Sequence, residues 1–271
     1  MNIVKKIFLF VGLSVVLISC KDITQTSTLP FPLQNSQSKI IDKTDNVSVL
    51  YSFMKEPFDA LITLDGTKTT EGDIVGNINV SIVNKKLQEE TLNFDIGGLQ
   101  LSKLSPLQYK YTTQDKESKI AFTQLFATNL SSSLNSNKAG NFKESLNMLP
   151  AIEVLKNTNG TISISKQTGF ELSWKPIIDN EIGVIIELSQ PFAKNATAPQ
   201  YIVAPDNGNY KLNQEDLKSF LLDDGSEGNA VYENTLKVNI YRGNFRMITS
   251  PEGYKFKIIA YSKAHYQFKL K

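Results

Sequence analysis

The stretch Ile74–Ile82, which reads IVGNINVSI, decides the fold class of this chain. From Ile78 to Ile82, isoleucine or valine occupies every second position, and asparagine or serine fills the positions between them. A period of two residues is typical of a β-strand that buries one face and exposes the other. The stretch therefore predicts a half-buried strand.

The same alternation recurs further along the chain. Leu92, Phe94 and Ile96 repeat it after a polar hairpin connection at residues 84–90. Closely spaced strands without a long apolar stripe of helical period predict an all-β protein, built from two tandem β-sandwich modules, rather than an α/β fold. The other expected strands lie at 60–64, 107–112, 120–127, 142–148, 161–165, 169–176, 183–189, 236–241, 254–260 and 266–270.

Two segments raise the question of helices. Residues 120–127 are expected to form a strand, although a helix is the alternative. The helical face would consist of Phe122, Leu125, Phe126 and Leu130. Asn213, followed three residues later by Asp216, predicts the start of a short helix that runs to Phe220, because an asparagine side chain can accept from free backbone N–H groups.

Composition limits the chemistry that is open to the chain. Its 271 residues are 41% hydrophobic, which suffices for one large or two ordinary folded domains. One histidine, one cysteine and one tryptophan leave few metal sites and no disulfide within the chain. We predict no cofactor and no metal. The 29 basic and 27 acidic residues are scattered, which argues against nucleic acid as a partner.

The first twenty residues have the layout of a secretory signal. Lys5 and Lys6 precede the apolar run Ile7–Ile18. At about 1.5 Å per helical residue, this run is too short to cross a hydrocarbon core of about 30 Å. We expect residues 1–19 to be removed as a signal peptide.

The sequence Leu17-Ile18-Ser19-Cys20 resembles the lipobox of bacterial lipoproteins. The resemblance implies that Cys20 begins the mature chain, carries a thioether-linked diacylglyceryl group, and has a freed amine open to acylation, for example by palmitate. A bystander thiol after an ordinary signal is the alternative. Buried acyl carbons contribute about 0.8 kcal/mol per CH₂, so two or three chains would hold the protein at a membrane. Lys21 replaces the aspartate linked with inner-membrane retention, so we expect the outer membrane.

Residues 20–46 are expected to form a lipidated tether. They contain Ser, Thr, Gln, Asn, Lys and Asp with two prolines within Leu29–Leu33, and they show no sustained period. A flexible coil of this length spans about 30 Å. The tether would lead into an N-terminal module at 47–156 and a C-terminal module at 157–271, divided at the turn-forming residues Asn157–Gly160.

The C-terminal module resembles fibronectin type III and immunoglobulin-like sandwiches. Leu172, Trp174 and Pro176 match the Leu-x-Trp-x-Pro phrase of type III domains, and Tyr254–Ala260 is similar to a later strand of that family. The resemblance implies that Trp174 lies in the core. The order of lipobox, tether and two β modules also resembles two-module envelope lipoproteins of uncharacterised function, which supply no active site.

One segment qualifies as a candidate contact surface. Tyr241, Arg242, Phe245 and Arg246 follow a predicted strand and combine arginine with aromatic side chains, which are enriched where partners bind. A hairpin with salt-bridged arginines is the alternative.

Three other candidates favour structural interpretations. His265 falls on the polar face of the last strand, and Asp206-Asn207-Gly208 is typical of a turn. The loop 223–229 carries many oxygen ligands but lacks the spacing of an EF-hand calcium site, so a solvated turn is favoured and calcium stays open. No catalytic residue is assigned.

These patterns predict a membrane-anchored envelope lipoprotein without enzymatic activity. Its β-sandwich modules would serve in binding, adhesion or spacing, with the membrane as partner through Cys20 and an unidentified protein or glycan as the second partner. One alternative is a polymer-degrading hydrolase that uses paired carboxylates. Another is an accessory subunit of an outer-membrane assembly.

Overall fold

The computed structural model describes residues 39–42, 52–53, 55–155, 162–177, 180, 182–190, 198–220 and 235–270. Cys20, the signal peptide 1–19 and most of the tether 20–46 lie outside the described residues. So do the loop 223–229 and the module boundary predicted near Asn157–Gly160. The structure does not test these predictions, except that residues 39–42 of the expected tether form a strand paired with residues 200–203 instead of a flexible coil.

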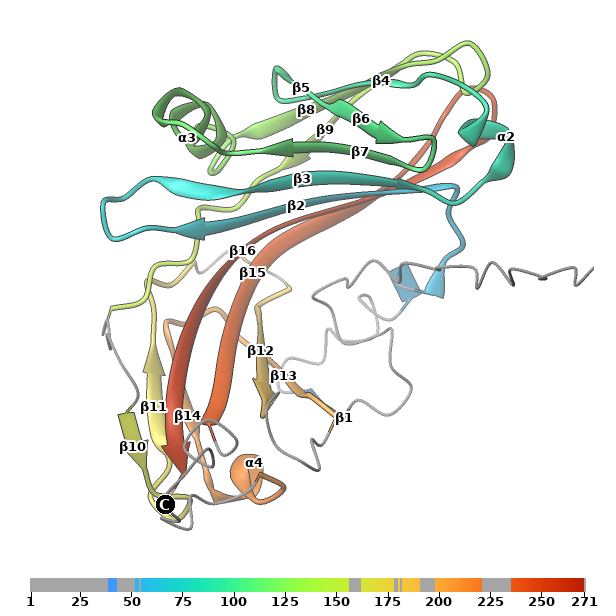
Figure 1. The fold of residues 1–271 in the computed structure, drawn as a ribbon. Helices are drawn as coiled ribbons and strands as arrows, with labels where there is room; N and C mark the ends of the chain where they lie inside the picture. The colour runs from blue at the N-terminus through green and yellow to red at the C-terminus, as the bar shows by residue number, and fades with distance from the viewer. Residues whose placement is uncertain are drawn as a thin grey trace, which may run out of the picture.

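The strands of the described residues form three sheets, and the prediction of an all-β sandwich fold is confirmed (Figure 1). The largest sheet has ten strands in the order β1 (Lys39–Asp42), β13 (Gln200–Ala204), β12 (Val184–Ser189), β15 (Thr235–Thr249), β16 (Lys255–Leu270), β2 (Ala60–Lys68), β3 (Ile74–Ile82), β7 (Gln108–Thr112) and β6 (Ser102–Ser105), with β10 (Ile162–Ile164) pairing β16 off this path. The second sheet contains β5 (Leu99–Gln100), β4 (Asn93–Ile96), β8 (Asn129–Asn135) and β9 (Phe142–Asn147), and the third contains β11 (Phe170–Ser173) and β14 (Asn209–Leu212).

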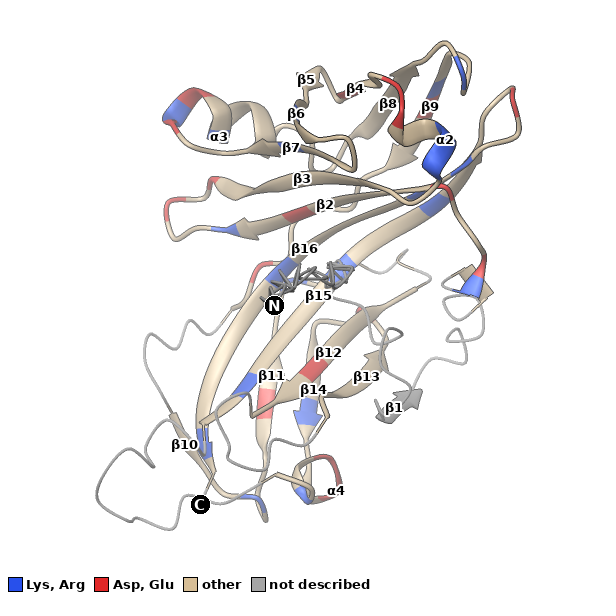
Figure 2. Cartoon of the chain, turned by 45° about the vertical axis from the view of Figure 1, so that its right-hand side comes forward, with Lys and Arg blue, Asp and Glu red and all other residues tan. Residues whose placement is uncertain are grey.

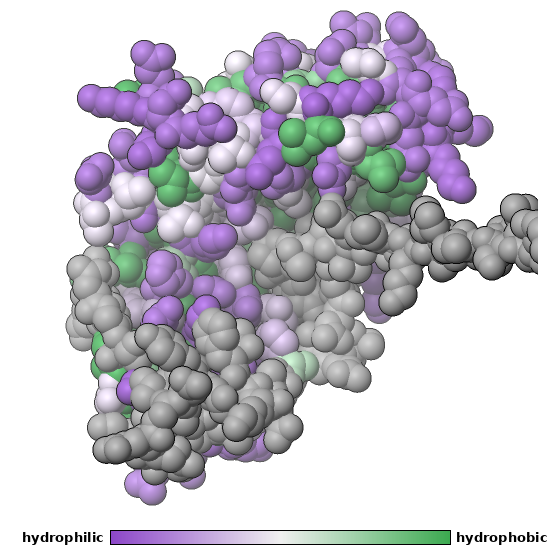
Figure 3. Space-filling model, in the orientation of Figure 1, coloured by the Kyte–Doolittle hydropathy of each residue, from purple (hydrophilic) through white to green (hydrophobic). Residues whose placement is uncertain are grey.

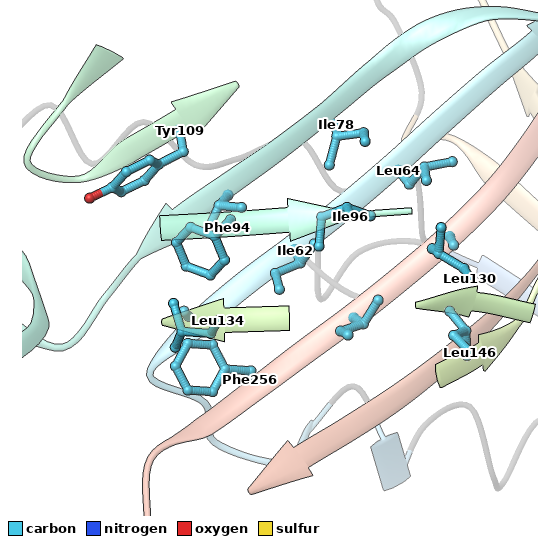
Figure 4. Close-up of a cluster of buried hydrophobic side chains, with 14 of the residues drawn as sticks. Ile62, Leu64, Ile78, Phe94, Ile96, Tyr109, Leu130, Leu134, Leu146 and Phe256 are labelled. Atoms are coloured by element: carbon cyan, nitrogen blue, oxygen red, sulfur yellow. The ribbon is translucent and has the colours of Figure 1, made fainter. Parts of the chain in front are cut away.

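The upper hydrophobic core lies between the four-stranded sheet and one end of the large sheet (Figure 4). Phe94 from β4 and Phe256 from β16 pack with their ring centroids 6.5 Å apart. In β3, Ile78, Val80 and Ile82 are buried as the alternation of the sequence predicts. Apolar side chains on one face of each strand thus close the first sandwich.

The lower core lies where β11 and β14 cover the other end of the large sheet. Trp174 is fully buried there, so its predicted place in the core is confirmed. On β16, Tyr266, Phe268 and Leu270 are buried and His265 is exposed, which also follows the predicted alternation.

The hairpin formed by β15 and β16 belongs to both cores, since it runs the height of the molecule (Figure 1). One face of β16 supplies Ile258 to the upper core and Phe268 to the lower core. Ser262 lies between the residues of β16 that enter the upper core and those that enter the lower core. Its hydroxyl accepts a hydrogen bond of 2.7 Å from the backbone N–H of Ile152. The two cores therefore share the same pair of strands.

The strand predicted at 120–127 is wrong, because α3 (Lys116–Thr123) covers its first half and turns follow as far as Ala127. The helix given as the alternative is the conformation that begins this segment. Asp115 caps the helix by accepting from the backbone N–H of Ser118, and the Ser118 hydroxyl oxygen accepts in turn from the backbone N–H of Asp115. The apolar residues of the segment follow the helical period, and Phe122 is buried against the sheet.

Two further helices within the described ranges are single turns. The polar connection at 84–90 contains α2 (Lys85–Gln88). The start predicted at Asn213 is confirmed, since its side chain caps α4 (Gln214–Leu217), although the helix ends before Phe220.

Candidate functional site

The contact surface predicted at Tyr241, Arg242, Phe245 and Arg246 requires correction. These residues lie inside β15, which pairs with β16 without interruption as far as Thr249, and they do not form a loop. Tyr241 is only 5% exposed and Arg242 only 2% exposed, so neither can form a contact surface. Phe245 packs on Phe53 with ring centroids 4.1 Å apart. Arg246 alone is exposed, and it pairs with Glu144 at 2.9 Å.

Arg242 is buried because it neutralises Asp206. The Arg242 guanidinium donates through Nε to Asp206 Oδ2 and through Nη2 to Asp206 Oδ1, each at 2.7 Å. The same carboxylate accepts from Trp174 Nε1 at 2.8 Å and from Asn180 Nδ2 at 2.9 Å. The predicted turn at Asp206 does contain Gly208, with a positive φ of 95°. The structural role of the carboxylate was missed because its partner lies far along the chain.

The face of the large sheet that points away from the lower core carries three tyrosines around Glu187. The Tyr241 hydroxyl donates to Glu187 Oε2 at 2.5 Å. Burial, helped by the charge of Glu187, raises the pKa of Tyr201 to about 12. Burial also raises the pKa of Tyr241 and Tyr261 above the usual range. These phenols are uncharged packing groups at neutral pH.

Lys257 is a buried cation on the same face. Its Nζ lies 4.6 Å from the ring centroid of Phe58 and 5.0 Å from that of Phe53, and it donates to the backbone oxygen of Glu56 at 2.8 Å. Burial lowers the pKa of Lys257, against the opposing charge of Glu56. This lysine therefore packs beneath aromatic rings as part of the structure.

A groove of about 640 Å³ opens beside β16, near the place where the two cores meet. We call it the edge groove. Its walls are the β2–β3 turn at 67–72, the crossing segment at 152–154, and residues 263–267 of β16. His265, which the sequence placed on an exposed strand face, is one of the wall residues.

The edge groove coincides with a gap in strand pairing. The parallel ladder between β16 and β2 ends at Lys263 opposite Thr67. The parallel ladder between β16 and β10 begins at Phe268 opposite Ile162. Between them, residues 264–267 have no ladder partner on this side within the described part of the chain.

Three charged side chains of the groove wall, Lys68, Glu153 and Lys263, form ion pairs. Lys68 Nζ lies 2.7 Å from Glu153 Oε2, and Lys263 Nζ lies 3.6 Å from Asp65 Oδ2. The hydrogen bond from Lys68, followed by its positive charge, holds the pKa of the Glu153 carboxyl below its usual value. Glu153 is therefore ionised at neutral pH and is a poor proton donor, so the groove is better suited to binding than to acid catalysis.

A smaller hollow of about 300 Å³ adjoins the groove and shares Thr67 and Lys263 with it. The backbone N–H of Asn77 donates to Asp65 Oδ1 at 2.9 Å, and Thr112 Oγ1 donates to Asn77 Oδ1 at 2.8 Å. Polar groups on this part of the sheet are thus held in fixed positions.

Neither metal ligation nor a membrane-spanning helix is found within the described ranges. No group of three or more histidine, cysteine, aspartate or glutamate side chains is placed there to hold a metal ion. No helix of the described part is long and apolar enough to cross a bilayer. On the face shown in Figure 3, the upper part is mostly hydrophilic, with small separate hydrophobic patches.

Comparisons with known proteins assign no family. No family model matches the chain, and no curated protein matches it. Three solved structures show only weak likeness. A tri-modular GH5 (subfamily 4) endo-β-1,4-glucanase from Bacillus licheniformis is 10% identical, with a TM-score of 0.28, covering 79% of this chain and 38% of that one. This chain therefore spans well under half of the glucanase.

The other two structures are more distant still. A 1.5-MDa bacterial ice-binding adhesin is 10% identical, with a TM-score of 0.20, covering 80% of this chain and 66% of that one. The chicken CNTN1 FN1–FN3 domains are 8% identical, with a TM-score of 0.18, covering 71% and 62%. Scores this low carry no argument about function.

Proposed function

We propose that this chain is a lipid-anchored, non-catalytic binding protein of the bacterial envelope, and that the edge groove receives its ligand. The observation that carries the proposal is a concave site of about 640 Å³ in which Lys68 and Glu153 form an ion pair. Ligand sites are typically concave and of about 300–1,000 Å³. A protein or a glycan is the expected partner class.

The anchor is proposed from the sequence Leu17–Cys20. Removal of Lys5 and Lys6 with the signal leaves equal numbers of basic and acidic side chains, so attachment would depend on acyl chains rather than on attraction to anionic lipid. Lys and Arg positions are interspersed with Asp and Glu positions along the described chain (Figure 2).

The anchor is tested by growing cells with a palmitate analogue and comparing wild type with Cys20→Ala. We expect the variant to lose the label and to leave the lipidated membrane pool. Ser14→Ala is the matched control, because it changes the apolar run but leaves Leu17–Cys20 intact. Equal labelling of the Cys20 variant would disprove lipidation at this residue.

The binding site is tested by capture from envelope extracts. Thr70 is exposed on the rim of the groove, so Thr70→Trp should obstruct the site and lower capture of any specific partner. Ser102→Trp places the same bulk on the distant edge strand β6 and should leave capture unchanged. Equal capture by both variants would exclude the groove. Release of reducing sugar from envelope polymers, lost in Glu153→Gln, would instead favour the hydrolase.

A further inference from the structure

We propose that the edge groove binds an extended polypeptide segment, which adds to β16 as a short strand between β2 and β10. This inference rests on the proposed binding function and names the class of ligand. It is carried by the direction of the backbone groups of β16 at the gap in strand pairing.

The start of β16 shows which backbone groups face β2. The backbone N–H of Asp59 donates to the oxygen of Lys255 at 2.8 Å, and the N–H of Lys255 donates to Asp59 Oδ2 at 2.7 Å. Both backbone groups of Lys255 therefore point toward β2. Backbone groups alternate in direction along a strand, and β16 pairs with β15 in continuous register. His265 has the same parity as Lys255, so its N–H and C=O point to the same side.

On that side, His265 faces the groove and not another strand. Pairing with β2 ends at Lys263, pairing with β10 begins at Phe268, and the described residues contain no ladder partner for His265 in between. An unpaired donor and acceptor at a sheet edge are a template for a further strand. β2 and β10, which both pair with β16 in parallel, lie at the two ends of this gap. A strand added between them would continue the pairing along this side of β16.

The side chains around the gap set the chemistry of the segment. Ala264 and Tyr266 point toward the lower core, and the wall there is completed by Ile152 and Val154. The other face of the strand carries His265. A strand inserted with the same pleat would therefore place small apolar side chains on the core side and polar ones on the outer side.

A peptide fits this site better than a sugar does. Tyr266 is the one phenylalanine, tyrosine or tryptophan among the described residues of the groove wall, but it is only 2% exposed, and its hydroxyl donates to the backbone oxygen of Ser173 at 3.2 Å. Its ring therefore cannot serve as a stacking platform. The paired charges of Lys68 and Glu153 also give no preference for a strongly charged ligand.

The test uses a phage-displayed library of linear peptides, panned against the mature chain in detergent. Selected peptides should bind His265→Ala within about threefold of wild type, because alanine keeps the backbone donor. They should bind His265→Pro at least about tenfold more weakly, because proline lacks the N–H. The thermal midpoint of each variant checks that it is folded. Equal binding by wild type and His265→Pro would overturn the proposal.

Hydrogen exchange provides a second measurement that needs no variant. A bound peptide should slow exchange of the His265 amide by about tenfold or more, since that N–H becomes hydrogen-bonded. Unchanged exchange at saturating peptide, a library that yields no binder, or binding confined to a glycan array would each reject strand addition. Capture that Thr70→Trp reduces but His265→Pro leaves intact would reject strand addition alone and retain the proposed binding function.

Discussion

Arg242 and Asp206 form a buried ion pair with two parallel hydrogen bonds of 2.7 Å, and the side chain of each is only 1% exposed. The pair links β15 to the turn after β13. Trp174 and Asn180 donate to the same carboxylate, so the charge is surrounded by three partners. A carboxylate so far from water depends on all of these donors.

Arg242→Met should destabilise the protein by about 3–5 kcal/mol, because it leaves the Asp206 charge buried without its main partner. Urea unfolding followed by circular dichroism measures the loss. The matched control is Arg246→Met, which breaks an exposed pair with Glu144 and should cost less than about 1 kcal/mol. Equal losses in the two variants would contradict the structural role assigned to Arg242.

The stability of the protein should fall as the pH rises from about 10 to 12. Burial, aided by Glu187, raises the pKa of Tyr201 to about 12, whereas a tyrosine in an unfolded chain ionises near pH 10. The unfolded state therefore releases a proton that the folded state retains, which favours unfolding in this window. Urea midpoints measured across it check the direction.

The charge of Glu187 contributes to that shift. Glu187→Gln should lower the pKa of Tyr201, as followed by NMR titration of its ring carbons, because the nearby negative charge is removed. Glu144→Gln, a substitution on β9, should leave the titration of Tyr201 unchanged. An unshifted Tyr201 in the Glu187 variant would show that burial alone sets its pKa.

Ser132→Ala should stabilise the protein by up to about 1 kcal/mol. The Ser132 hydroxyl is buried in β8 and has no hydrogen-bond partner in the described part of the chain. An unsatisfied buried hydroxyl carries a desolvation penalty that alanine removes. Ser133→Ala, on the other face of the same strand, is the control and should change the urea midpoint little. A less stable Ser132 variant would show that the hydroxyl is satisfied.

Gly76→Ala should destabilise the protein by about 1–3 kcal/mol or more. A Cβ at Gly76 would lie only 1.9 Å from the backbone oxygen of Asp65, so β2 and β3 would have to separate. Ser81→Ala tests a partly exposed site on the same strand and should change stability by less than about 0.5 kcal/mol. Thermal midpoints of the two variants distinguish the close backbone approach from a general effect on β3.

Much of the sheet architecture could be predicted because it rests on local alternation. Ile74–Ile82 and Tyr266–Leu270 bury alternate residues as their sequences indicate. The helix at Lys116–Thr123 was only the alternative to a strand, although Asp115 followed by Ser118 is a local capping signal. In that segment the apolar spacing suited both periods, and the cap decides between them.

The site could not be predicted because it depends on distant pairing. The alternation of the sequence predicted that His265 lies on an exposed face. The groove beside it exists only because the pairing of β16 with β2 ends at Lys263 and its pairing with β10 begins at Phe268. The combination of arginine and aromatic residues around Arg242 suggested a contact surface, yet its partner Asp206 lies 36 residues earlier and turns a charged position into a buried one. No local pattern contains that information.

The hairpin of β15 and β16 has a mechanical meaning for the whole chain. Both cores contain side chains from β15 and β16. If these strands detached from one core, the other core would lose their side chains as well. The two sandwiches are therefore joined through a shared pair of strands rather than by a linker. A force applied to one sandwich is transmitted to the other through these strands, without an intervening hinge.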